Sequence, residues 1–160
     1  MGVVLKTSME SIDDLIEQAN RTIYQEIVRA LSYLGEQSVA KVRDREQSES
    51  WIDQTGNLRS SIGYAVYSHG KQLMESAFDM VRNGTQGQSE GRRMVESLAN
   101  QYSTTYAMVV VAGMNYAEFV EARESKDVLA STEIWAKSKI DDYLKKAKER
   151  ALKKINAIKL

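Results

Sequence analysis

The stretch that decides the fold runs from Asp53 to Gly63 and reads DQTGNLRSSIG. It contains Thr55-Gly56-Asn57, which has turn chemistry because glycine adopts positive φ freely and Thr and Asn side chains bond their own backbone. Leu58 and Ile62 are spaced so that one helical turn would place both on the same face. We therefore predict an anchored corner, with Leu58 and Ile62 in a core and Arg59 held outside it.

A long helical pattern precedes this corner. Apolar residues recur at steps of three and four from Ile12 to Leu34, and the pattern extends to about Arg45. Ser8 or Ser11 is expected to cap its start. A helix of about 37 residues would be about 55 Å long, whereas a compact chain of this length has a radius of gyration of about 15 Å. We therefore expect this helix to bend, with Gly35 as the weak point, or to project and lie against a neighbouring subunit.

Two segments rich in strand formers follow the corner, at 64–68 and 104–112. The second is apolar on both alternating faces at its end, so we expect it to be the central strand of a sheet. Residues 69–71 predict a tight turn. This favours a hairpin in which residues 72–78 return as a strand, although their apolar spacing also suits a helix. Just ahead of the corner, Trp51-Ile52 is expected to enter the core.

The remaining segments are a glycine-rich stretch and two helical patterns. Residues 82–91 hold three glycines among polar residues and predict a mobile loop, with a helix from about Ser89 to Gln101. We interpret residues 79–101 as a loop and a helix, and residues 1–7 as a loose lead-in. A last helix, expected to begin near Ser131, has one apolar stripe like the first, so the two terminal helices should pack together.

The predicted fold is a single α+β domain over residues 1–160. It has a long N-terminal helix, a small mostly antiparallel sheet and a long C-terminal helix packed across it. One domain is the default for 160 residues, and a chain of this length can bury roughly two thirds of its unfolded surface.

The overall composition narrows the classes of function. Twenty-two basic and 22 acidic residues cancel, so no global field indicates nucleic acid or an anionic membrane. The absence of cysteine excludes disulfides and thiolate metal sites, and it fits an intracellular protein. No apolar run approaches the ~20 residues of a membrane span, so we expect no membrane partner.

The sequence offers little that could support catalysis. The only histidine, His69, lies beside a glycine in a predicted turn, where we expect a solvated side chain and not a base. The glycines at 84, 87 and 91 lack the Lys-Ser/Thr ending of a phosphate-binding loop. Carboxylates on the first and last helices flank apolar stripes, as ordinary solvated residues do. We therefore predict no enzyme, and no catalytic, cofactor or metal site.

The C-terminal helical pattern carries a local positive charge. From Lys137 to the end there are nine basic and three acidic residues. Such a helix could follow phosphates, which makes a small nucleic-acid-binding or regulatory protein the alternative function. However, cations at a helix C-terminus are also favoured by the helix dipole, and the aromatic residues do not alternate with the basic ones. A nucleic-acid partner is therefore not the preferred interpretation.

Two segments carry a resemblance to a known family. Residues 51–63 read WIDQTGNLRSSIG, and residues 110–121 read VVAGMNYAEFVE. In this order, after a long first helix, they resemble the phage tail-component family of siphophage neck and tail-completion proteins. That family has a T-G-N-L-R-x-S-I-type motif and a later Y-A-x-x-V-E-type motif. The resemblance covers roughly residues 8–158. It departs at residues 122–124, where this chain has Ala-Arg-Glu and many members have Phe-Gly-Thr. The loop and helix at residues 79–101 also look like an insertion relative to short members of the family.

The resemblance implies a structural virion protein of a tailed phage or prophage, without catalytic residues. Members assemble as rings, often described as hexameric, where the tail tube meets the head connector. The implied partners are further copies of the chain and other neck and tail proteins, and the implied location is the virion, with the host cytoplasm during assembly. The expected core and subunit-contact residues are Thr55, Gly56, Asn57, Leu58, Arg59, Ile62, Gly113, Tyr116, Ala117, Val120 and Glu121.

Overall fold

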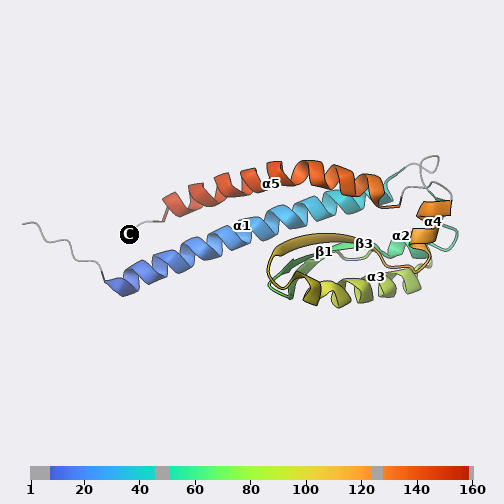
Figure 1. Cartoon of the computed structure of the whole chain (residues 1–160), viewed down its shortest axis with the longest axis horizontal. Helices are drawn as coiled ribbons and strands as arrows, with labels where there is room; N and C mark the ends of the chain where they lie inside the picture. Colours follow the sequence, from blue (N-terminus) through green and yellow to red (C-terminus); the bar gives the residue numbers. More distant parts are fainter. Residues whose placement is uncertain (1–7, 46–50, 124–127, 159–160) are drawn as a thin grey trace, which may run out of the picture.

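The computed structural model describes residues 8–45, 51–123 and 128–158, and Figure 1 shows their arrangement. The expected lead-in at residues 1–7 lies outside the described residues. The predicted α+β fold is confirmed. Its elements are α1 (Met9–Arg43), α2 (Asn57–Ser60), β1 (Ile62–Ser68), β2 (Lys71–Glu75), α3 (Thr85–Leu98), the 3₁₀ helix η1 (Ala99–Tyr102), β3 (Tyr106–Ala112), α4 (Ala117–Arg123) and α5 (Ala130–Asn156).

The helices cover both faces of the sheet. Figure 1 shows α1 over one face, α3 over the other, and α5 lying along α1 on the side away from the sheet. The expected pairing of the two terminal helices is therefore confirmed. The N-terminal part of α1 extends past the sheet, and α1 is a single helix that continues through the predicted weak point at Gly35. A Cβ at Gly35 would lie 2.3 Å from the ring of Tyr64, so this glycine lets helix and sheet approach closely.

The sheet has three antiparallel strands in the order β2-β1-β3. The predicted hairpin is confirmed as β1 and β2, but the prediction that residues 104–112 form the central strand is wrong. The central strand is β1, all of whose residues are buried, and β3 is an edge strand. Because α1 and α3 cover both faces, an edge strand here also needs apolar residues on both sides, and its sequence imitates that of a central strand.

Two apolar clusters stabilise these layers. The first lies between the sheet and α1 and includes Leu31, Leu58 and Ile62. The second lies between the sheet and α3 and includes Tyr67 and Val95, with the phenol of Tyr67 donating to the Val95 carbonyl oxygen at 2.7 Å. The sheet therefore separates two apolar clusters, and β1 contributes residues to both of them.

The glycine-rich residues 82–91 do not form the predicted loop. Helix α3 begins at Thr85, earlier than the predicted Ser89, and ends at Leu98. Gly87 and Gly91 are buried, and a Cβ at Gly91 would lie 2.6 Å from the ring of Phe78. These glycines allow close packing of a helix, and a sequence pattern does not distinguish this role from chain flexibility.

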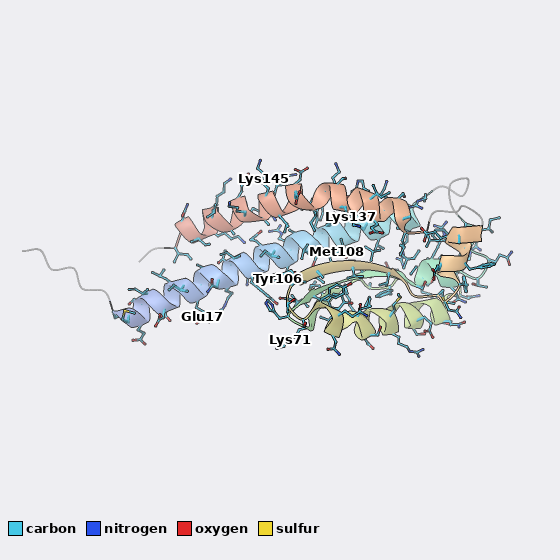
Figure 2. The ribbon with its side chains drawn as sticks, in the orientation of Figure 1. Glu17, Lys71, Tyr106, Met108, Lys137 and Lys145 are labelled. Carbon is cyan, nitrogen blue, oxygen red and sulfur yellow. The ribbon has the colours of Figure 1, made fainter. Side chains whose placement is uncertain are left out.

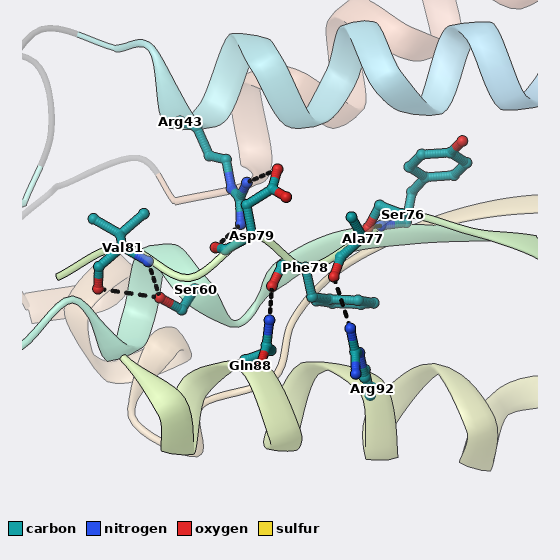
Figure 3. Close-up of polar contacts among 10 residues, drawn as sticks. Arg43, Ser60, Ser76, Ala77, Phe78, Asp79, Val81, Gln88 and Arg92 are labelled. Carbon is teal, nitrogen blue, oxygen red and sulfur yellow. Dashed lines mark hydrogen bonds and ion pairs between the residues drawn. The ribbon is translucent and has the colours of Figure 1, made fainter. Parts of the chain in front are cut away.

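The segment between β2 and α3 is irregular but is held at several points (Figure 3). The side-chain amide of Gln88 donates to the Phe78 carbonyl oxygen at 2.7 Å, and the Val81 N–H donates to Ser60 Oγ at 2.8 Å. Phe78 has a φ of 51° and a fully buried ring. Because that conformation cannot continue a strand, β2 ends before the end of the predicted strand at 72–78.

Candidate functional site

The corner at residues 53–63 is organised by a carboxylate. Asp53 accepts hydrogen bonds from the N–H of Gly56 at 2.9 Å and from the N–H of Arg59 at 2.8 Å, which caps the short helix α2. Gly56 has a φ of 82°, and a Cβ there would lie 2.0 Å from the Val81 carbonyl oxygen. Sequence reasoning did not single out Asp53, although an acid just before a turn and a helix start is a capping signal.

Two polar side chains extend this corner. Thr55 Oγ1 accepts from the Asn57 N–H at 3.2 Å, as the predicted turn chemistry requires. Asn57 Oδ1 accepts from the N–H of Gly87 at 3.1 Å, which joins the corner to α3. The segment interpreted as an insertion therefore contacts the first motif directly.

The predicted burial of the corner's apolar residues is confirmed for Leu58 and Ile62, which are 1% and 0% exposed. Arg59 is half-buried and is not among the buried core residues, as predicted. Its guanidinium lies 5.1 Å from the ring centroid of Trp51 and donates to the Arg43 carbonyl oxygen, so it joins the corner to the end of α1. Trp51 is buried as expected, but Ile52 is 69% exposed because neighbouring residues of an extended segment point to opposite sides.

The second motif meets the first at Ser61. The Gly113 N–H donates to the Ser61 carbonyl oxygen at 3.1 Å, and the Met114 N–H donates to Ser61 Oγ at 3.3 Å. A Cβ at Gly113 would lie 2.5 Å from the backbone nitrogen of Gly91, so Gly113 also lets β3 pass close to α3. Sequence reasoning missed Ser61, because nothing in its own neighbourhood indicates a partner more than fifty residues away.

The remaining residues of the second motif have different surroundings. Ala117 is buried, whereas Tyr116 and Val120 line a shallow pocket of about 370 Å³ with Thr55 and Leu58. Burial raises the pKa of Tyr116, and the nearby charge of Asp53 raises it further. These residues bring the two motifs together on one surface.

Glu121 serves the fold and is a helix cap. Its carboxylate accepts from the Leu129 N–H at 3.3 Å and from the Ala130 N–H at 2.9 Å, at the start of α5. The positive end of the helix dipole also stabilises a negatively charged carboxylate in this position. The second motif therefore positions α5 as well as contacting the corner.

The far end of the molecule presents a different surface, a groove between α1 and α5 about 420 Å³ in volume. Apolar side chains from both helices line it, and several of them, including Ile23, Leu144 and Leu152, are exposed. Beyond this groove, α1 continues with Ile12 and Ile16 exposed on its surface. Contiguous exposed apolar side chains are a feature of protein-binding, membrane-binding and ligand-binding surfaces.

The part of the chain that the structure describes was compared with the requirements of a metal cluster and of a membrane-spanning helix. Across residues 8–45, 51–123 and 128–158, no three or more His, Asp or Glu side chains are grouped so that they could bind a metal ion. Over the same ranges, no helix combines the length and apolar character needed to cross a bilayer. Comparisons of the chain with protein-family models, with characterised proteins and with solved structures found no match.

Proposed function

We propose that this chain is a structural protein of a tailed phage or prophage. In this proposal it is a head–tail junction or tail-completion component that binds further copies of itself and other neck and tail proteins. The observation that carries the proposal is the contact at Ser61. The two segments that resemble the phage family are far apart in the sequence, and they meet there through the backbone of Gly113 and Met114.

The use of the polar side chains supports a structural role. Asp53 and Glu121 cap helices, and Asn57 joins the corner to α3. His69 Nδ1 lies 2.6 Å from Ser68 Oγ, and the imidazole ring contacts the edge of Tyr106. Asp53, Asn57 and Glu121 thus hold elements of the fold together, and His69 is exposed, as expected. Polar side chains used in this way suit a protein that acts through its surfaces.

Part of the positive charge of the C-terminal helix α5 has a structural role. Arg150 Nε and Lys154 Nζ donate to the carboxylate of Glu26 at 2.6 Å and 2.7 Å. Two of the cations that suggested a phosphate-binding helix are thus engaged in holding α5 to α1. We therefore do not extend the proposal to nucleic acid.

The experiment that tests this proposal is deletion of the gene from the phage or prophage that encodes it. Electron microscopy of the resulting lysate should show filled heads and tails that are not joined, or tails that are not completed. A plasmid copy of the wild-type gene should restore joined particles. Joined, infectious particles in the deletion strain would contradict the proposal.

A further inference from the structure

We propose that the groove between α1 and α5 binds the N-terminal part of α1 from a second copy of this chain. The inference rests on the proposed function, for which it names the surfaces through which two copies bind. The groove is lined chiefly by Ile23, Ile27, Leu144, Ala147, Ala151 and Leu152, with Glu26, Lys148 and Ile155 also in its lining.

The shape of the groove suits a helix. Ala147 and Ala151 are buried and one helical turn apart, so the floor is low where they lie. Larger side chains rise on both sides, and Ile23, Leu144 and Leu152 are 42%, 37% and 48% exposed. Small residues in a row between larger ones form the kind of groove that receives the side-chain ridge of another helix.

The projecting end of α1 has the complementary shape. Helix α1 has 35 residues and α5 has 27, so α1 is eight residues longer. Figure 1 shows its N-terminal part extending past α5 and the sheet. Ile12 and Ile16 lie one turn apart on this part and are 38% and 54% exposed. They form a short apolar ridge, on a segment that its own chain leaves exposed.

The charges favour the N-terminal part of α1 from a second copy as the segment that binds in this groove. Residues 9–20 contain four acids, Glu10, Asp13, Asp14 and Glu17, and no Lys or Arg. On α5, Lys148 lines the groove, and Lys145 lies one helical turn before it on the same side of the helix. Figure 2 labels Glu17 on the projecting part of α1 and Lys145 on α5. The acids of the ridge would therefore meet Lys145 and Lys148 on the α5 side of the groove when two copies bind, and opposite charges favour that encounter.

An ion pair between an acid of α1 and basic residues of α5 already exists within one chain. Glu26 of α1 is 2% exposed and lies between Arg150 and Lys154 of α5. Glu17 has a pairing of its own with Arg21 at 2.9 Å, but both side chains are largely exposed. Such a pair is worth little, so it leaves Glu17 available for a second copy.

The test is a charge exchange measured by sedimentation velocity on the purified full chain, up to about 200 µM. One variant carries Asp13→Lys and Glu17→Lys, and the other carries Lys145→Glu and Lys148→Glu. The wild type should self-associate. Each variant alone should associate at least about tenfold more weakly, because like charges then face each other. An equimolar mixture of the two variants should recover the association, because each ridge again meets a groove of opposite charge.

A matched control reverses two charges on the other side of α5, with Lys146→Glu and Lys153→Glu. It should associate like the wild type. All variants should retain the wild-type helix signal in circular dichroism, since the changed side chains are exposed or line the groove.

Four results would overturn the inference: a monomeric wild type at the highest concentration, unchanged association of both variants, no recovery in the mixture, or an equal loss in the control. None of them bears on the particle-deletion experiment, which decides the proposed function separately.

Discussion

The N–H of Gly87 donates to the side-chain oxygen of Asn57 at 3.1 Å, and a Cβ at position 87 would lie 1.9 Å from the Asn57 carbonyl oxygen. Helix α3 and the corner are therefore in backbone contact. Alanine normally stabilises a helix by about 1 kcal/mol relative to glycine. Here the opposing atom belongs to the backbone and cannot rotate away.

We predict that Gly87→Ala lowers the free energy of unfolding by about 1–3 kcal/mol, because the overpacking outweighs the helix propensity. Chemical denaturation with urea measures the change. Gln86→Ala, at the exposed neighbouring position of the same helix, should change stability by no more than about 0.5 kcal/mol. A stabilised Gly87→Ala protein would mean that α3 does not lie against the corner.

A second prediction concerns the two apolar residues around the corner. Leu58 is 1% exposed and Ile52 is 69% exposed. Leu58→Ala should cost about 2–5 kcal/mol through lost burial and a cavity. Ile52→Ala, which removes a similar side chain from the surface, should cost less than about 0.5 kcal/mol. Equal melting temperatures for the two variants would show that the corner is not packed.

A third prediction concerns pH and the link between α1 and α5. Hydrogen bonds from Lys154 and then from Arg150 lower the pKa of Glu26 below its ordinary value of 4.5. The ionised carboxylate therefore stabilises the folded state fully above that value, and the contribution is lost as the pH falls through the lowered pKa. Because both cations are partly exposed, Glu26→Gln should cost only about 1–3 kcal/mol at pH 7.

The measurement is urea denaturation of wild type and Glu26→Gln at a series of pH values. The difference in free energy of unfolding should be constant near neutral pH and should shrink below about pH 4.5. A difference that grows as the solution is acidified would contradict this assignment. Glu17→Gln, which changes an exposed carboxylate on the same helix, should show a difference near zero throughout.

A fourth prediction concerns the core beneath α3. Burial raises the pKa of Tyr67 to about 12, and its phenol donates to the Val95 carbonyl oxygen. Its stabilising effect is fully present below the ordinary tyrosine pKa of 10.0 and is lost as the pH rises from there through about 12. Tyr67→Phe leaves that carbonyl without its donor and should cost about 1–2 kcal/mol at pH 7.

Thermal unfolding monitored by circular dichroism measures this cost, with Tyr33→Phe as the exposed control. The destabilisation by Tyr67→Phe should diminish above pH 10, because the phenol of the unfolded wild type ionises there whereas the buried phenol ionises only near pH 12. A Tyr67→Phe protein as stable as the wild type at neutral pH would show that the phenol lies in water.

Much of the fold was predictable from local patterns. The long apolar period gave α1, the turn at residues 69–71 gave the hairpin, and the matching stripes gave the pairing of α1 with α5. Each of these signals depends on residues close together in the sequence. The position of β3 at the sheet edge was not predictable, because helices on both faces remove the alternation that would mark an edge strand.

Only those features of the corner that depend on nearby residues were predictable from the sequence. The burial of Leu58 follows from its spacing with Ile62, but the place of Arg59 depends on Trp51 and on the end of α1. The roles of Ser61 and Gly87 depend equally on distant backbone. The contacts of side chains that join separate elements depend on the tertiary fold. A single sequence carries no local signal for such contacts.

The central claim is that this chain is a part of a tailed particle. Quantitative mass spectrometry of particles purified from cells that encode it, after phage growth or prophage induction, measures this most directly. We predict that the chain is present in several copies per particle and remains with the joined head and tail through purification. Complete, joined particles that lack the chain would contradict the proposal.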